Sequence, residues 1–340
     1  MKSKIFIIAE IGVNHNGSIR TAKKLIKELS KLDIDAVKIQ AFSADSLASK
    51  EAKLAVYQSQ NTSGFKSQHE MLKEYELSEE KINILNKYTK ELGIEFMSSV
   101  FSVEDYKKIT KLNKKRIKIP SGEFSNLNLI QVALQKYKEV ILSTGLSDLK
   151  EIDQVMKMIK SYRNDFKGIT LLHCTSAYPC PEDEVDITSI LKIKEKYNVK
   201  VGYSDHTVGS SASIMAIALG ARVIEKHVTL DNKMKGPDHK ASQNIYEFKN
   251  FVNEVRLAES MLGDGKKSIN ESALKNKQIV KKSIYAKTEI KKDEIFSKKN
   301  LALLRPEGGI SPQSLDKLIG KRAKKKYDSG EIISKNELKK

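Results

Sequence analysis

Tryptophan is absent from this 340-residue chain, aromatic residues make up 6% of it, and only two cysteines occur. Basic and aromatic residues are not interleaved, as they are in proteins that stack single-stranded nucleic acid on aromatic rings. The spacing of Cys174 and Cys180 matches neither a zinc knuckle nor a thioredoxin motif. We therefore expect neither a structural zinc site nor a disulfide framework.

Long apolar runs are also missing. None approaches the roughly 18–20 residues needed to span a bilayer. The first apolar run meets Glu10, where a signal peptide would need a longer apolar stretch. Hydrophobic residues make up 39% of the chain and are spread along it, so a sizeable core can be buried. We expect a soluble, cytoplasmic protein with no membrane partner.

The formal net charge of +18 is compatible with nucleic acid, a membrane surface or small anionic substrates. Most lysines, however, lie singly or in pairs within helix-like segments, where a solvated face is the simpler interpretation. The charge favours anions without naming one. Nucleic-acid binding is a weak hypothesis that the charge alone supports, and we expect no nucleic-acid partner.

Short apolar, β-branched runs alternate with amphipathic stretches of helix length, a pattern typical of βα units and a parallel sheet. Eight units favour a closed barrel over an open doubly wound sheet, since no glycine-rich dinucleotide-binding motif follows the first run. The predicted strands are 4–9, 35–41, 94–99, 116–120, 139–143, 169–174, 199–203 and 221–227. The predicted helices lie near 18–32, 78–92, 102–111, 126–137, 148–162, 186–197, 209–219 and 244–262.

Two segments depart from this alternation. Residues 42–77, which include Tyr57, Gln58, Asn61 and Gly64, form a long connection on the expected catalytic face, and such connections are usually functional or disordered. After residue 265 the alternation ends, and a lysine-rich linker at 266–280 leads into strand-like runs and turn signals. We predict a (β/α)8 TIM barrel at 1–265 and a small, mostly β domain at 281–340.

Polar or ionisable residues end nearly every predicted strand. In a TIM barrel these ends converge on one mouth, where active sites are built from several strands. The residues are Glu10, Asn14, His15, Lys38, Gln40, Ser98, Ser99, Lys118, Ser121, Glu123, Ser143, Thr144, His173, Thr175, Ser176, Tyr178, Ser204, Asp205, His206, Glu225, Lys226 and His227. Together they predict an active site at that mouth.

Three features of this mouth indicate a chemistry. His206 and His227 end neighbouring strands, so their imidazoles can share a divalent metal that keeps positions open for water and substrate. Lys38 and Lys118 suit a phosphate and a carboxylate together. Glu10 and Glu123 are candidates for acid–base chemistry or hydroxyl binding. The hydroxyls that accompany the lysines are those of Ser99, Ser121, Ser143 and Ser204.

A series of short motifs runs along almost the whole chain: AEIGVNHNG at 9–17, VKIQAF at 37–42, KIPSGE at 118–123, STG at 143–145, LLHCTSAYPCP at 171–181, VGYSDHT at 201–207, EKHVTLD at 225–231 and GPDHKAS at 236–242. In this order they resemble the sialic acid synthase family. KKSIYAKTEIKKDEIFSKKNL and RPEGGIS, within 281–311, look like the antifreeze-like (SAF) domain fused to these synthases.

This resemblance implies an N-acetylneuraminate synthase, which condenses phosphoenolpyruvate with open-chain N-acetylmannosamine and releases phosphate by carbon–oxygen cleavage. It implies a divalent metal on His206 and His227, manganese first and magnesium or cobalt as alternatives, and no organic cofactor. The implied catalytic residues are Glu10, Asp238 and His227, with proton transfer assigned to Glu10 or, alternatively, Asp238.

The resemblance also implies two sets of binding residues. Phosphoenolpyruvate would be held by Lys38, Ser99, Lys118, Ser121, Ser143, Ser176 and Ser204. The sugar would be contacted by Gln40, Asn61, Glu123, Tyr178, Asp238 and Arg305. Because Arg305 lies in the SAF domain, a homodimer is implied in which that domain reaches into the partner's barrel.

Two departures from the family pattern leave the sugar open. Ser98-Ser99-Val100-Phe101 stands where many members have Ser-Thr-Pro-Phe, and Thr175-Ser176-Ala177 stands where many have Thr-Asn before the Tyr-Pro pair. Within the class, the alternative is a synthase for N,N'-diacetyllegionaminate or pseudaminate. From another class, a non-catalytic sugar- or anion-binding barrel is possible, but the histidine pair, the lysines and Glu10 argue against it.

Overall fold

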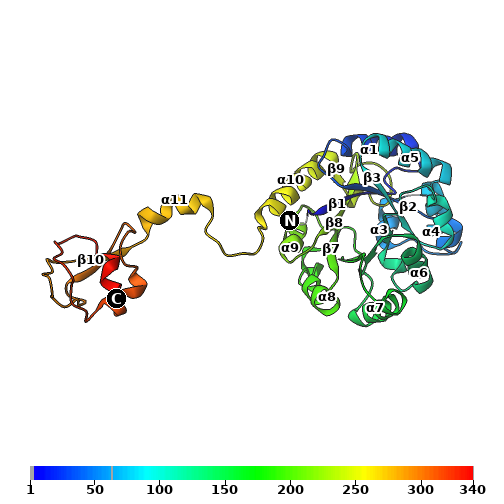
Figure 1. Cartoon of the computed structure of the whole chain (residues 1–340). Coiled ribbons are helices and arrows are strands. Elements are labelled where there is room, and N and C mark those ends of the chain that lie inside the picture. The colour runs from blue at the N-terminus through cyan, green and yellow to red at the C-terminus, as the bar shows by residue number, and fades with distance from the viewer. Residues whose placement is uncertain (1–3, 63, 340) are drawn as a thin grey trace. The chain divides into compact units, whose positions relative to one another are not determined.

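The computed structural model describes residues 4–62 and 64–339. They divide into two compact units, one that extends to Asp264 and one that begins at Gly265 (Figure 1). No helix in this part of the chain is long and apolar enough to cross a membrane.

The first unit is a closed barrel of parallel strands, which pair in chain order and close through β1 and β8. Its strands are β1 (Phe6–Gly12), β2 (Ala36–Ala41), β3 (Glu95–Val100), β4 (Arg116–Ile119), β5 (Glu139–Ser143), β6 (Ile169–His173), β7 (Lys200–Asp205) and β8 (Val223–Thr229). A short strand, β9 (Gln243–Asn244), pairs with the end of β8. The predicted (β/α)8 barrel is confirmed, and its strands lie where the apolar runs placed them.

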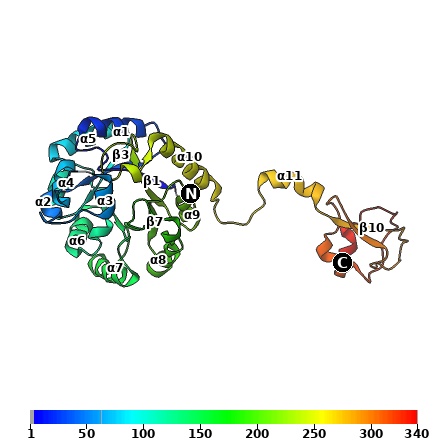
Figure 2. The same ribbon diagram turned by 180° about the vertical axis from the view of Figure 1, so that it is seen from behind.

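Helices surround the sheet, as both views show (Figure 1 and Figure 2). They are α1 (Ile19–Leu29), α5 (Glu79–Glu91), α6 (Leu127–Lys136), α7 (Leu149–Arg163), α8 (Ser189–Tyr197), α9 (Ser211–Ala218) and α10 (Ile245–Met261). The side chains of Ser18, Asp148 and Asn244 cap three of them by accepting backbone N–H groups.

The helix predicted at 102–111 is instead a 3-10 helix, η1 (Glu104–Ile109). The buried carboxylate of Asp105 accepts hydrogen bonds from the backbone N–H groups of Ser43, Phe101 and Ser102. These bonds hold the segment in a tight turn, which explains why the amphipathic pattern does not produce an α-helix here.

The connection at 42–77 is more ordered than the sequence predicted. It contains three short helices, α2 (Ala44–Leu47), α3 (Val56–Asn61) and α4 (Gln68–Tyr75). Met71, Leu72 and Tyr75 of α4 are buried in one cluster with Phe42 and Val13. Tertiary packing therefore stabilises helices that are too short to persist alone.

Successive layers fill the barrel. Side chains two residues apart on a strand point the same way, so every second residue faces the interior. The inner apolar cluster is formed by Ile8, Ala36, Met97, Ile141, Leu172 and Val223. Two residues further along the same strands stand Glu10, Lys38, Ser99, Ser143, Cys174 and Glu225. The strand alternation thus places a polar layer directly on an apolar plug.

The second unit has its own core, which includes Ile284, Phe296, Leu318 and Tyr327. Its regular elements are α11 (Glu271–Val280), β10 (Ser283–Ala286), β11 (Leu301–Leu304) and α12 (Leu315–Leu318), and β10 pairs with β11 in antiparallel fashion. The segment predicted as a linker at 266–280 therefore contains a helix. Helix α11 has no buried residue, so amphipathicity gave no signal for it.

Candidate active site

A cavity of about 410 Å³ opens at the carboxyl ends of the barrel strands. The structure brings most of the predicted site residues together along its wall. Those that line it are Glu10, Lys38, Gln40, Ser99, Lys118, Ser121, Glu123, Ser143, Ser176, Tyr178, Ser204, His206 and His227. Residues from every barrel strand or the loop after it thus meet in one place.

Several strand-end residues do not line this cavity: Asn14, His15, Ser98, Thr144, His173, Thr175, Asp205 and Lys226. Of the residues to which the resemblance assigned a role, three are also not among those that line it. Asp238 is buried just behind it, with its Oδ2 atom 3.9 Å from Nδ1 of His227. Asn61 lines a neighbouring cavity and donates a hydrogen bond to the carbonyl of Pro237. Arg305 belongs to the second unit, where it is exposed directly after β11.

Two lysines and two carboxylates form a buried network at the base of the cavity. Lys38 Nζ lies 2.7 Å from Glu10 Oε2 and 3.7 Å from Glu225 Oε2. Lys118 Nζ donates to Glu225 Oε1 at 2.8 Å. None of the four side chains is more than 5% exposed. Each charge is tolerated in the barrel because an opposite charge lies against it.

Electrostatics make the two carboxylates different. Burial alone would raise the pKa of Glu225, but the charges of Lys118 and Lys38 outweigh burial and lower it to about 2. Burial raises the pKa of Glu10, and the neighbouring charge of Glu225 adds to this against the opposing effect of Lys38. Glu225 is therefore a fixed counter-charge, whereas Glu10 is the better candidate for exchanging a proton.

Hydroxyl groups surround the lysines. Ser99 accepts a hydrogen bond from Lys38 at 2.8 Å, and Ser204 donates to Glu225 at 3.1 Å. Ser121 accepts from the backbone N–H of Gly145 at 3.0 Å. A Cβ atom at Gly145 would lie 2.6 Å from Ser176 Oγ, so only glycine leaves the space between these hydroxyls open. The arrangement is a cradle for an anion.

His206 and His227 lie side by side at the rim, with ring centroids 5.7 Å apart. His206 Nδ1 lies 2.6 Å from the carbonyl of Thr175, so this nitrogen carries the hydrogen and Nε2 is unprotonated. Burial lowers the pKa of His206 to about 4 and that of His227 well below its ordinary value. Both imidazoles are therefore neutral at pH 7, as metal ligation requires.

The two histidines supply only part of the coordination that a metal ion needs. His227 Nδ1 is buried without a hydrogen-bond partner, so it is available as a ligand. No group of three or more histidine, cysteine, aspartate or glutamate side chains that could hold an ion occurs in residues 4–62 and 64–339. An ion on the two imidazoles would therefore need water or substrate to complete its coordination.

Asp238 is the second acid–base candidate. Burial and the charge of Glu10 raise its pKa to about 7. A carboxyl group with such a pKa can both give and take a proton near neutrality. It lies beside His227, behind the residues that line the cavity.

Sequence reasoning missed the role of one lining residue and did not identify others as part of the site. Glu225 stood among the strand-end residues without a role, although its position two residues after the apolar Val223 marks it as facing the interior. Gln68 and Leu72 also line the cavity, together with Tyr57 and Gln58. Only their place in the long connection pointed to them, because the packing of α3 and α4 could not be predicted.

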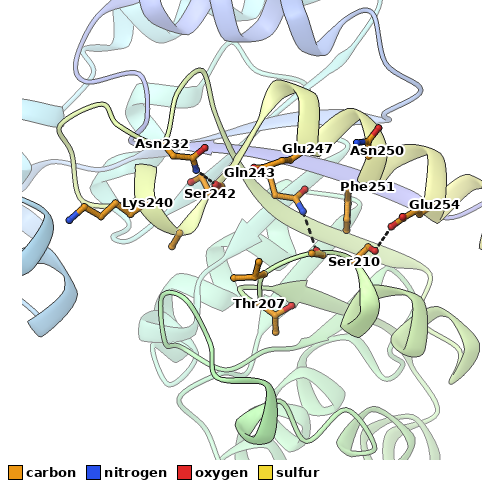
Figure 3. A pocket seen from close by; sticks show the side chains of 13 residues that line it. Thr207, Ser210, Asn232, Lys240, Ser242, Gln243, Glu247, Asn250, Phe251 and Glu254 are labelled. Atoms are coloured by element: carbon orange, nitrogen blue, oxygen red, sulfur yellow. Dashed lines mark hydrogen bonds between the residues drawn. The ribbon is translucent and has the colours of Figure 1, made fainter.

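A second cavity, of about 360 Å³, lies between the loops after β7 and β8 and helix α10 (Figure 3). Its polar groups are largely satisfied by one another: Ser210 donates to Glu254, and Gln243 donates to the carbonyl of Gly209. Lys240 is the one cation among its lining residues, and no predicted site residue lines it. It is not the candidate active site.

Comparisons with known proteins agree with this geometry. The NeuB family model matches residues 25–267, and the SAF domain model matches residues 281–339. N,N'-diacetyllegionaminic acid synthase of Campylobacter jejuni is 42% identical over 330 residues, which cover 97% of this chain and 99% of that one. N-acetylneuraminate-9-phosphate synthase of Homo sapiens is 31% identical over 319 residues, 93% of this chain and 88% of that one.

The solved structures point the same way. The N-acetylneuraminic acid synthetase of Leptospira borgpetersenii, determined in complex with citrate, superposes with a TM-score of 0.71 at 28% identity. The match covers 81% of this chain and 90% of that one. The resemblance inferred from the motifs is confirmed, and the chain belongs to the NeuB family of sialic-acid-type sugar-acid synthases, with a SAF domain after its barrel.

Proposed function

We propose that this synthase condenses phosphoenolpyruvate with an open-chain N-acylated amino sugar and releases phosphate by carbon–oxygen cleavage. The observation that carries the proposal is the buried network of Lys38, Lys118, Glu10 and Glu225 at the base of a cavity open on the sugar side. An incoming phosphate and carboxylate can replace carboxylate contacts of the two lysines, so the site is built to exchange one anion for another.

The favoured sugar is a diacetamido trideoxyhexose, as in N,N'-diacetyllegionaminate synthesis. The Campylobacter jejuni relative that makes this type of product is 42% identical, against 31% for the human N-acetylneuraminate-9-phosphate synthase. The cavity also has apolar lining from Leu47, Leu72 and Phe101, which suits deoxy and acetyl methyl groups better than hydroxyls. N-acetylmannosamine, expected first from the motifs, is the second candidate, supported by the Leptospira structure.

Binding of phosphoenolpyruvate uses the strand-borne end of the cavity. Lys38 and Lys118 neutralise its phosphate and carboxylate, and the Gly145 turn leaves room for both groups. The hydroxyls assigned to it are those of Ser99, Ser121, Ser143, Ser176 and Ser204.

The sugar occupies the rim, between Tyr178 and the histidines. Its proposed contacts are Gln40, Asn61, Glu123, Tyr178, Asp238 and Arg305. A divalent ion, manganese by preference, would be held by His206 and His227 and would polarise the aldehyde oxygen when bound. No organic cofactor is required. Glu10, between Lys38 and Gln40, moves the proton as water adds and phosphate leaves, and Asp238 is the alternative.

A homodimer with a composite site completes the proposal. Leu146 lines the cavity and is 64% exposed, and Val56, next to Tyr57, is 74% exposed. In the second unit, Leu303 and Leu304 are partly exposed directly before Arg305. Exposed apolar side chains thus lie both around the mouth of the barrel and beside Arg305. They support docking of the partner's SAF domain at this mouth.

The product assay tests the function itself. Incubation of the protein, Mn²⁺ and phosphoenolpyruvate with the diacetamido sugar should release phosphate and yield an acid heavier than the sugar by one pyruvate unit, detected by mass spectrometry. N-acetylmannosamine should react more slowly. Phosphate release without a new acid, or no reaction with any N-acylated amino sugar, would rule the proposal out.

Removing one lysine should weaken the binding of phosphoenolpyruvate more than the binding of the sugar. We expect Lys118→Met to raise the KM for phosphoenolpyruvate by roughly 10- to 100-fold, since a charge-assisted hydrogen bond contributes about 1.5–3 kcal/mol. Lys226→Met is the matched control, because Lys226 is equally buried but pairs with Asp205 away from the cavity. If both variants lose affinity for both substrates alike, the barrel has collapsed and Lys118 is not an anion ligand.

The histidine variants test the metal. His206→Ala and His227→Ala should each abolish metal-dependent turnover and lower the bound manganese measured after gel filtration, while circular dichroism stays that of the wild type. His173→Ala provides a control, since His173 ends β6 but contacts the carbonyl of Val185 outside the lining. Near-normal activity with bound metal in either rim variant would contradict the assignment.

Loss of the second unit tests the composite site. A chain that ends at Asp264 keeps the barrel and its core, so it should unfold cooperatively and bind phosphoenolpyruvate in calorimetry, yet lose most turnover. Arg305→Ala should raise the KM for the sugar. A mixture of the Arg305→Ala and Glu10→Ala variants should recover activity, because each heterodimer contains one site in which both residues are intact. A fully active truncation, or no recovery in mixtures, argues against a shared site.

A further inference from the structure

The segment between β2 and α5 contributes one wall of the cavity, and the polar residues of this wall that line the cavity have no role in the proposed mechanism. Tyr57 and Gln58 of α3 and Gln68 and Leu72 of α4 all line the cavity. Glutamine amides and a phenol at a ligand cavity are groups that recognise a ligand rather than react with it.

Hydrogen bonds fix the orientation of this wall. The Oε1 atom of Gln58 accepts from the backbone N–H of Ala55 at 3.0 Å and from Nε2 of Gln68 at 3.2 Å. Because the Ala55 amide can only donate, the atom that faces it must be the oxygen of Gln58. The Nε2 atom of Gln58 is therefore directed at Tyr57, and it donates to the phenol oxygen at 3.3 Å.

This arrangement leaves the Tyr57 hydroxyl with one role. Its oxygen accepts from Gln58, and no described residue accepts a hydrogen bond from its O–H group. Burial and the charge of Asp238 raise the pKa of Tyr57, so the phenol keeps its hydrogen at any assay pH. Gln58 already donates to the hydroxyl oxygen, so the hydroxyl hydrogen of Tyr57 is free to be donated to a ligand in the cavity.

Ring contacts connect Tyr57 to the histidine pair through Tyr178. The ring centroid of Tyr178 lies 4.2 Å from that of His206 and 5.1 Å from that of Tyr57, and the ring planes are tilted by 35° in both contacts. If the aldehyde of the sugar is at the histidine pair, Tyr57 is one aromatic ring further away. It is therefore placed to meet a substituent remote from the reacting carbon.

An apolar corner adjoins the amides. Gln68 and Leu72 are four residues apart on α4, so they project from the same helix face. Leu72 packs in one cluster with Leu47 and Phe101, and all three line the cavity. A hydrogen-bond donor beside an apolar corner matches an acylamino group, which presents a carbonyl oxygen and a methyl group together.

We propose that Tyr57 is a specificity-determining residue, which donates its hydroxyl hydrogen to the carbonyl oxygen of the acylamino group remote from the aldehyde while Leu47, Leu72 and Phe101 enclose the methyl of that group. Gln58 and Gln68 are positioning residues that act through Tyr57. This inference rests on the proposed function, and it names the feature by which this synthase separates a diacetamido sugar from a monoacetamido sugar.

Tyr57→Phe tests the donor, because it removes the hydroxyl and keeps the ring. We expect kcat/KM for the 2,4-diacetamido-2,4,6-trideoxy sugar to fall by roughly 5- to 10-fold through KM, the loss typical of one neutral hydrogen bond. The KM for phosphoenolpyruvate should stay within twofold. For the 4-hydroxy analogue of the same sugar, the variant and the wild type should have the same kcat/KM, or the same inhibition constant if the analogue acts as a competitive inhibitor.

Tyr75→Phe is the matched control, since Tyr75 lies on α4 in the same segment but does not line this cavity. This variant should leave kcat/KM for both sugars unchanged. Wild-type protein that reacts with no N-acylated sugar would refute the proposed function rather than the role of Tyr57. An active wild type with an unaffected Tyr57→Phe variant, or equal losses for the diacetamido sugar and its 4-hydroxy analogue, would overturn the role of Tyr57.

Discussion

Everything at this site depends on the ion pairing of Lys38, Lys118, Glu10 and Glu225 inside the barrel. Breaking one buried pair of this kind leaves an uncompensated charge and costs about 3–5 kcal/mol. The pairs therefore hold the strands' polar layer in one arrangement before any substrate arrives. An anionic substrate then meets cations that are already positioned, so little rearrangement is needed when it binds.

The strands explain why the network can be both buried and rigid. Ile8 precedes Glu10, Ala36 precedes Lys38, and Val223 precedes Glu225 by two residues, so the apolar plug and the charged layer share the same inward face. The wall that faces the sugar is different, because Tyr57 and Gln68 come from short helices in a connection. Under the proposed function, phosphoenolpyruvate would be bound by residues of the strands and the sugar in part by residues of the connection.

The sequence predicted the strands and the strand-end residues well, because β-branched runs and polar termini are local signals. It could not predict the role of Glu225, since its partner Lys118 lies 107 residues away and meets it only across the closed barrel. Helix α4 was missed because its stability comes from packing with Phe42 and Val13 rather than from its length. Helix α11 was missed because it buries no face.

Under the proposed function, carbon–carbon bond formation at this cavity proceeds with cleavage between carbon and the bridging oxygen of phosphoenolpyruvate. Phosphoenolpyruvate carrying ¹⁸O at that bridging position tests it most directly when the mass of the phosphate released with the diacetamido sugar is measured. We expect the label to leave with phosphate. Label retained in the sugar acid would show phosphorus–oxygen cleavage and would contradict the mechanism assigned to this site.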